Sequence, residues 1–264
     1  MAKNIDVSTM KSIRNRIRTG EYSGPTSGLA QGFVQANVVI LPQQYVADFM
    51  RFCLLNPQPC PLLAVSEVGD PTLPALGDVD IRSDVPAYRV FENGHESSVQ
   101  TDITSLWTKD LVAFALGCSF SFEEALLEAG LPIRHYDSGK PNPVYISNIP
   151  TKQAGAFAGP MVVSMRPYTV QNTIRAIQIT SRFPRVHGAP IHFGDPEAIG
   201  ISNLSKPDFG GEAVPIYEGE TPVFWACGIT PQMAIQHARI PFCITHRPAS
   251  MLITEIRNSD LSIF

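Results

Sequence analysis

The sequence of 264 residues predicts an α/β fold with an internal βα repeat. The first observation is that residues 111–132, shifted by 109 positions, align with residues 220–241, which contain the segment PVFWACGITPQMAIQHARIP. Each copy has an apolar run, small residues, a hydroxyl residue and an apolar helical face, the pattern of a strand, a tight turn and a capped helix. The second observation is a strand–helix–strand order in residues 33–66. No obvious linker divides the chain. Because the two copies of the repeat lie far apart, we expect two lobes that share a sheet or pack with the site between them.

Composition narrows the classes of function. The net charge of −4 argues against nucleic acid as the main partner. The sequence shows no apolar run of signal-peptide or membrane-spanning length, so we expect a cytoplasmic protein with no membrane partner. Five cysteines in mostly apolar surroundings indicate reduced thiols, and without a C-x-x-C motif we expect no structural zinc. The chain could form a homo-oligomer.

The N-terminal elements follow in order. Residues 8–18 have apolar side chains at helical spacing and predict a short amphipathic helix. Residues 33–41 have the composition of a strand. Pro42 then opens a helix that ends at the segment NPQPCP, and residues 62–66 predict a second short buried strand.

An acidic, proline-rich segment comes next. Its carboxylates could hold a cation or supply an acid and a base, and the alternative that we favour is a solvated acidic loop. Residues 88–107 alternate as in a β-hairpin around residues 92–94. The carboxylates of the segment are Glu67, Asp70, Asp78, Asp80 and Asp84.

Strands and one helix complete the pattern. Residues 144–147 and 160–165 predict strands, and residues 170–182 predict a helix with Ile174, Ile177 and Ile179 inward. Residues 242–256 contain a strand-like pair around Thr245 to Arg247. The segment after the long helix holds the densest group of polar residues of catalytic type: Arg182, Arg185, His187, His192 and Asp195.

The two repeat turns are the most informative candidate sites. A helix N-terminus has free N–H groups and a favourable dipole, so it prefers anions. Two such turns in one chain suggest a pocket for carboxylates. The candidate substrate-binding residues at the turns are Cys118, Ser119 and Ser121 in the first copy, and Cys227, Gly228 and Thr230 in the second.

Nucleophilic catalysis is an alternative use of the same turns. The order Ser119, Asp195, His246 matches a hydrolase triad, although the G-x-S-x-G motif is incomplete. Cys118 and Cys227 could also be nucleophiles, because a helix N-terminus lowers the pKa of a thiol. The opposite interpretation is that both cysteines fill apolar space.

Histidines and arginines supply the remaining candidates. His187 and His192, with Asp195, could bind a metal, but they lie on a loop without helical spacing, so we favour general acid–base chemistry or hydrogen bonding. Arg182 borders a turn where a guanidinium can bind a carboxylate in bidentate fashion, and a structural ion pair is the alternative.

Seven blocks of sequence support a resemblance to a known family. The blocks run almost from end to end: GPTSGLAQGFVQANVVILP (24–42), FCLLNPQPCPLLAVSEVGDP (52–71), DIRSDVPAYRV (80–90), LVAFALGCSFSFEEAL (111–126), GPMVVSMRP (159–167), QITSRFPRVHGAPIHFGDP (178–196) and PVFWACGITPQ through PFCITHRP (222–248). In these blocks the chain resembles the hydro-lyase family that includes the D-glutamate cyclase domain.

The resemblance implies a fold and an activity. The implied fold is a three-layer α/β lobe with a second, smaller α+β lobe, for which we predict residues 1–75 and 165–264 as the main lobe and residues 76–164 as the smaller one. The implied activity is loss of water from a small amino-dicarboxylic acid, in particular cyclisation of D-glutamate to 5-oxo-D-proline. Nothing in the sequence requires a cofactor.

This activity gives each candidate residue a hypothetical role. The turn residues would bind an anion and Arg182 the α-carboxylate, His187 and His246 would be the acid–base pair, and Glu67 or Asp80 would bind the ammonium. The rival hypotheses are a carboxylate-binding protein without catalysis and a serine or cysteine acyl hydrolase.

Overall fold

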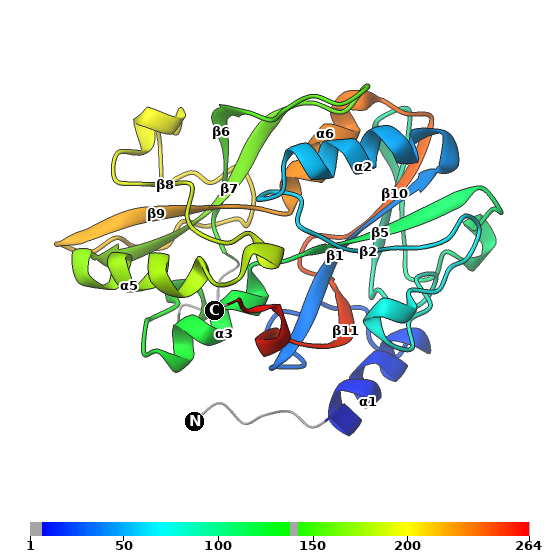
Figure 1. The fold of residues 1–264 in the computed structure, drawn as a ribbon, viewed down its shortest axis with the longest axis horizontal. Coiled ribbons are helices and arrows are strands. Elements are labelled where there is room, and N and C mark those ends of the chain that lie inside the picture. The colour runs from blue at the N-terminus through cyan, green and yellow to red at the C-terminus, as the bar shows by residue number, and fades with distance from the viewer. Residues whose placement is uncertain (1–6, 138–141, 264) are drawn as a thin grey trace.

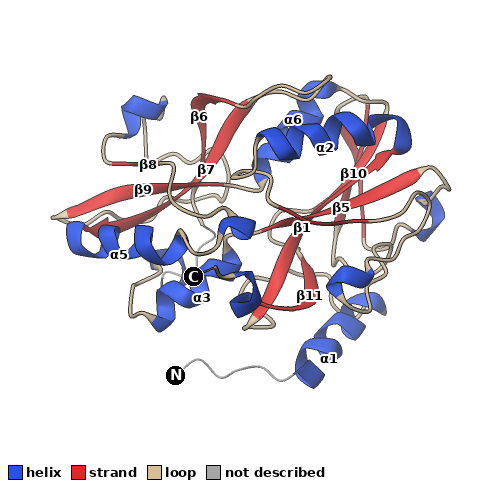
Figure 2. Cartoon of the chain, viewed as in Figure 1, coloured by secondary structure: helices blue, strands red, loops and turns tan. Residues whose placement is uncertain are grey.

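The computed structural model describes residues 7–137 and 142–263, which form an α/β fold of two lobes, as the sequence predicted. Strands run through the middle of the molecule and helices lie at its periphery (Figure 2). The helices are α1 (Val7–Arg18), α2 (Val46–Leu55), α3 (Phe120–Glu128), α4 (Arg134–Asp137), α5 (Val170–Thr180) and α6 (Ile229–Ala238).

Two antiparallel sheets organise the described residues. The larger sheet has the order β2-β5-β1-β10-β3-β4, with β11 also paired to β1, and the smaller has the order β6-β7-β9-β8. The larger contains β1 (Phe33–Pro42), β2 (Leu62–Val65), β3 (Tyr88–Glu92), β4 (His95–Gln100), β5 (Leu111–Gly117), β10 (Phe242–His246) and β11 (Leu252–Arg257). The smaller contains β6 (Val144–Pro150), β7 (Pro160–Thr169), β8 (His192–Phe193) and β9 (Glu220–Ala226).

The internal repeat extends beyond the two segments found in the sequence. In the first copy β1 pairs with β5, and Ala36 lies opposite Gly117. In the second copy β7 pairs with β9, and Val163 lies opposite Ala226. Gly117 on β5 and Ala226 on β9 are again 109 positions apart. The pairing of β1 with β5 and the pairing of β7 with β9 each continue without a register shift. The first strand of each pair leads into a helix, α2 or α5, and the second into α3 or α6. The molecule is therefore built from two similar halves.

The two halves exchange strands. β6, which follows α3 of the first half, pairs with β7 of the second, where Tyr145 lies opposite Val163. β11, which follows α6 of the second half, pairs with β1 of the first, where Leu252 lies opposite Ala36. Ala36 and Val163 are equivalent positions of the repeat, so the exchange is reciprocal. Neither sheet is complete without the other half of the chain.

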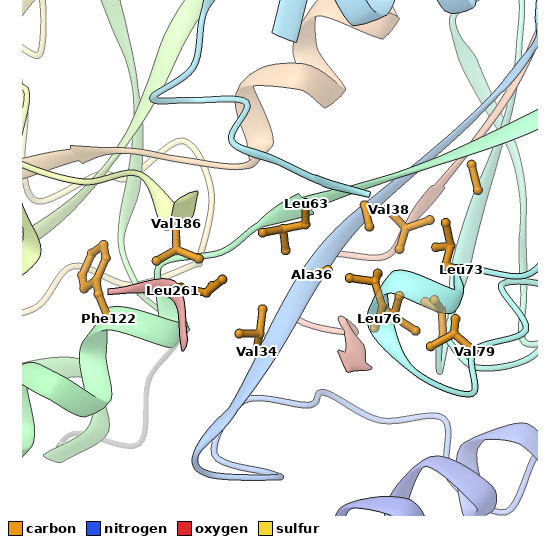
Figure 3. Close-up of a cluster of buried hydrophobic side chains, with 14 of the residues drawn as sticks. Val34, Ala36, Val38, Leu63, Leu73, Leu76, Val79, Phe122, Val186 and Leu261 are labelled. Atoms are coloured by element: carbon orange, nitrogen blue, oxygen red, sulfur yellow. The ribbon is translucent and has the colours of Figure 1, made fainter. Parts of the chain in front are cut away.

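The strand β1 is buried on both faces. Val34, Ala36 and Val38 face one apolar cluster, whereas Val39 and Leu41 face another. Figure 3 shows Val34, Ala36 and Val38 along β1 within the first cluster. At one end of this cluster are Phe122, Val186 and Leu261, and at the other end are Leu73, Leu76 and Val79. The second cluster takes side chains from α2 and α6, whereas α3 packs against α5 (Figure 1).

Most predicted elements agree with the structure. The amphipathic helix is α1, the hairpin is β3 and β4 with the turn at Asn93 and Gly94, and the long helix is α5. The prediction that Ile174 faces inward is wrong, because Ile174 is exposed and the buried residues of α5 are Thr173, Ala176 and Thr180. Pro42 ends β1, and a 3-10 helix (Gln43–Tyr45) precedes α2. In the acidic segment, Asp80 pairs with Arg82 and Asp84 with Arg18, so these carboxylates stabilise a loop. The division into residues 1–75 with 165–264 and residues 76–164 stays a prediction.

Candidate functional site

The two repeat turns meet at Asn37, near the end of the pairing between β1 and β5. The Asn37 amide donates a 2.8 Å hydrogen bond to the carbonyl of Gly117, in the first turn. Gly228, in the second turn, lies so close to Asn37 that an added Cβ would overlap its side-chain amide. The turns of both halves thus converge on one buried side chain. We call this region, formed by residues 117–119, residues 226–228 and Asn37, the junction.

A cysteine precedes the N-cap residue of each helix at the junction. The Cys118 sulfur accepts a hydrogen bond from the Phe120 amide, and the Cys227 sulfur accepts from the amides of Gly228 and Ile229. Burial raises the pKa of Cys118 to about 12 and that of Cys227 to about 11. The expectation that the helix N-termini lower these pKa values is therefore wrong, because loss of hydration outweighs the amide dipoles. Both side chains are neutral thiols at pH 7, which disfavours a cysteine nucleophile.

A buried ion pair lies beside the first turn. Arg166 on β7 donates to Glu123 on α3 through Nε, at 2.9 Å, and through Nη2. The same guanidinium donates to the hydroxyls of Ser119 and Ser164 at 3.2 and 3.1 Å. Burial acts to raise the pKa of Glu123, but the charge of Arg166 dominates and the pKa falls to about 2. Arg166 therefore remains a positive charge next to Ser119, inside the protein.

His187 is a neutral, buried imidazole near the same turn. The 3-10 helix before it (Pro184–Val186) packs so tightly on Gly117 that a Cβ there would overlap the Arg185 carbonyl. The Nδ1 atom of His187 lies 2.6 Å from the Gln58 carbonyl, which can only accept, so Nδ1 carries the hydrogen. Its Nε2 atom is buried without a hydrogen-bond partner. Burial lowers the pKa of His187 to about 4, so Nε2 has an available lone pair at pH 7.

His246 is the last residue of β10, where it lies opposite Tyr88 on β3. Its Nδ1 accepts a 3.0 Å hydrogen bond from the Val38 amide, next to Asn37. The Gln232 amide, on the first turn of α6, lies 3.4 Å from both ring nitrogens. Burial lowers the pKa of His246 to about 4, so this ring is neutral too. Both predicted acid–base histidines therefore lie close to the junction.

The structure separates other predicted residues from the junction. Glu67 is exposed on a loop, and Asp80 forms its ion pair with Arg82. Arg182 is exposed at the end of α5, where its Nε donates to the Ile263 carbonyl. Ser121 lines a groove together with Arg182, whereas the Thr230 hydroxyl is bonded to Val162 on β7.

The proposed hydrolase triad is not assembled. Ser119 accepts from Arg166, the Asp195 carboxylate accepts from the Glu197 amide, and His246 is bonded to Val38. The ring of His192 contacts the Asp195 carbonyl at 2.7 Å. Within residues 7–137 and 142–263, no group of three or more His, Cys, Asp or Glu side chains could hold a metal ion.

Sequence reasoning missed four residues of the site: Asn37, Glu123, Arg166 and Gln232. A signal for two of them was present, because Glu123 and Gln232 are equivalent polar positions in the two repeat helices. Both are buried, and each lies beside a histidine: His135, whose Nε2 is 3.5 Å from Glu123, and His246. A polar residue repeated on an apolar helix face indicates a buried partner.

A separate groove runs along α3. Its volume is about 950 Å³. Side chains from α3, from the end of α5 and from the C-terminal 3-10 helix (Asn258–Leu261) line it. None of the described helices is both long and apolar enough to cross a bilayer.

The fold and the site define a class: an α/β protein of two duplicated halves with a buried polar junction between them. The chain belongs to the D-glutamate cyclase family, whose model matches residues 112–255. This confirms the family resemblance of the sequence blocks.

Relatives named "Putative hydro-lyase" match nearly the whole chain. One from Bordetella petrii is 57% identical over 251 residues, covering 95% of each chain. Another from Bordetella pertussis is 59% identical over 248 residues, covering 94% of this chain and 89% of the relative. Among solved structures, a nitrogen repressor-like protein from Methanococcus jannaschii matches 96% of each chain with a TM-score of 0.41 and 12% identity, too weakly to inform function.

The contact between the two turns predicts an energetic coupling. Gly228 has φ −65°, which alanine adopts without strain, so Gly228→Ala isolates the overlap with Asn37. We expect this variant to lose about 1–3 kcal/mol of stability in urea unfolding. Adding Asn37→Ala should recover part of that loss, because the smaller side chain makes room. Strictly additive effects of the two substitutions would contradict the contact.

The buried ion pair predicts a pH-dependent stability. The pKa of Glu123 is about 2 in the folded protein against its usual 4.5, so its stabilisation is fully present above pH 4.5 and is lost as the pH falls towards 2. We expect this group to contribute about 2 kcal/mol to the stability lost between pH 5 and pH 3.

The double variant Glu123→Gln with Arg166→Met removes both charges and should lack that contribution. Urea unfolding at pH 7, 5 and 3 measures it. His187 and His246, whose pKa values are lowered, change the stability of the protein at higher pH, between about 6.5 and 4. This change should be equal in the wild-type protein and the double variant. An unchanged loss between pH 5 and pH 3 in the double variant would contradict the assignment.

Proposed function

We propose that the protein is a lyase that eliminates water from a small amino-dicarboxylic acid, and that it cyclises D-glutamate to 5-oxo-D-proline at the junction. The family and the names of the relatives support the reaction class. We place the reaction at the junction because two helix N-termini converge there on Asn37. The buried guanidinium of Arg166 and the neutral imidazole of His187 lie beside them.

The charges at the junction suit a dicarboxylate. Two helix dipoles point their positive ends at the region, and Arg166 adds a full positive charge next to Ser119. The substrate γ-carboxylate would lie between the turns, with the Ser119 hydroxyl and the two thiols as hydrogen-bond donors to its oxygens. Cys227 is partly exposed, so it offers the side of entry.

His187 would carry the protons. Its Nε2 takes a proton from the substrate ammonium and passes it to the γ-carboxylate. The free amine then attacks the γ-carbon, and the electron pair of the C=O bond moves to oxygen, which Arg166 and the turn donors stabilise. When the C–O bond breaks, the second proton from nitrogen follows to the departing oxygen. Both protons lost by nitrogen thus leave in the water molecule.

The lowered pKa of His187 fits this relay. An imidazolium with a pKa of about 4 is matched to a carboxyl group, whose ordinary pKa is about 4.3, so transfer to the γ-carboxylate is nearly balanced. The first transfer, from the ammonium, is uphill in water, and removal from water lowers the ammonium pKa. Arg182, Glu67 and Asp80 have no part in this proposal, because they lie outside the junction. His246 would orient the second turn through Gln232.

A binding protein without catalysis is the rival. Its ligand would be retained unchanged, so calorimetry combined with chromatography of the incubated D-glutamate separates the two functions.

The proton relay predicts the effect of His187→Asn. His187 has φ 85°, a left-handed conformation that asparagine tolerates well, and the new amide can still donate to Gln58. We expect kcat for D-glutamate to fall at least about 100-fold, because the proton carrier is lost. Chromatographic assay of 5-oxo-D-proline measures it.

The matched control is His95→Asn on the exposed strand β4, which should keep wild-type turnover. Thermal unfolding of both variants checks that they are folded. If the folded His187→Asn variant turned over D-glutamate at the wild-type rate, the relay would be wrong.

A further inference from the structure

The groove along α3 is distinct from the junction. Its wall includes Ser121 and Glu124, which lie on a different face of α3 from Glu123 and its ion pair. Asn258 and Ser259, near the C-terminal end of the described chain, form part of the opposite wall. The groove is therefore formed by α3 of the first half and by the end of α5 and the C-terminal segment of the second half, and its lining contains neither Cys118 nor Cys227.

Two residues of the groove lining each have a buried polar atom without a partner. The Oγ atom of Ser121 and the Oδ1 atom of Asn258 make no hydrogen bond within the described residues. These residues are 1% and 7% exposed. A buried polar group without a partner costs about 1–3 kcal/mol, so such atoms indicate a ligand that supplies the missing bond. Asn258 Oδ1 can only accept, which requires a ligand with an N–H or O–H donor.

Charges in the groove indicate the rest of the ligand. Arg257 lines it with its guanidinium stacked 4.1 Å from the centre of the Phe33 ring, and this guanidinium makes no ion pair within the described part of the chain. Arg182 is a second cation of the lining. Glu124 lies beside Asn258, whose amide donates to it at 2.7 Å. The groove thus presents cations for a carboxylate, and acceptors for an ammonium.

We propose that this groove is a second small-molecule site, which binds an amino acid. The carboxylate pairs with Arg257 and Arg182, and the ammonium donates to Asn258 Oδ1 and Glu124. The Ser121 hydroxyl completes its bonding with the ligand. The site is independent of the proposed cyclisation, since none of its residues belongs to the junction.

Isothermal titration calorimetry tests the groove with D-glutamate, L-glutamate and glutarate as probes. The titrations use the His187→Asn protein, in which turnover should be blocked. Besides binding of D-glutamate at the junction, which the groove variants should leave unchanged, we expect a second glutamate-binding event that Ser121→Ala and Arg257→Gln each weaken at least about tenfold, the equivalent of about 1.4 kcal/mol. Glutarate has both carboxylates but no ammonium, so it should bind at least tenfold more weakly than glutamate.

Matched controls are Ser181→Ala and Arg51→Gln, at exposed positions outside the groove lining, which should bind glutamate as the parent does. The proposal would be overturned by the absence of a glutamate-binding event that both groove variants weaken, or by glutarate binding in that event as tightly as glutamate. Failure of the cyclase assay would leave this result unaffected, because binding is measured without turnover. If the wild-type protein shows no cyclase activity but glutamate binds in the groove as expected, only the proposed function has failed.

Discussion

The reciprocal exchange of strands is the constraint on which the rest of the structure depends. β6 of the first half completes the sheet of the second, and β11 of the second half completes the sheet of the first. Each half on its own would leave the edge of a central strand unpaired, which is costly for buried backbone. The exchange therefore fixes the two halves relative to each other. It also brings β1 of one half, with Asn37, against the turn of the other half at Gly228.

Burial then decides the chemistry of the junction. The same removal from water keeps the cysteines protonated, keeps His187 and His246 neutral, and leaves Arg166 charged because Glu123 is its partner. A thiol at a helix N-terminus in water would behave differently. The junction therefore combines one fixed cation, neutral donors and a neutral base, a set suited to stabilising developing negative charge while moving protons.

The sequence predicted the local structure well, because hydrophobic period and turn residues specify strands and helices over short ranges. It predicted the repeat turns, and the structure brings Cys118, Ser119, Cys227 and Gly228 together. It could not predict the strand exchange, because pairing between distant strands leaves no periodic signal. Arg166 was missed because it ends an apolar run, and its buried partner is 43 residues away. Arg182 was favoured because it borders a turn where a guanidinium can bind a carboxylate, but its exposure is a tertiary property that the sequence pattern does not contain.

The most direct test of the shared junction is a crystal structure of the His187→Asn protein soaked with D-glutamate. The account predicts electron density for the ligand between the two turns, with its γ-carboxylate near Ser119 and Cys227 and on the side of Arg166. A second ligand molecule in the groove along α3 is compatible with this result. An empty junction at saturating D-glutamate, with or without ligand in the groove, would contradict it.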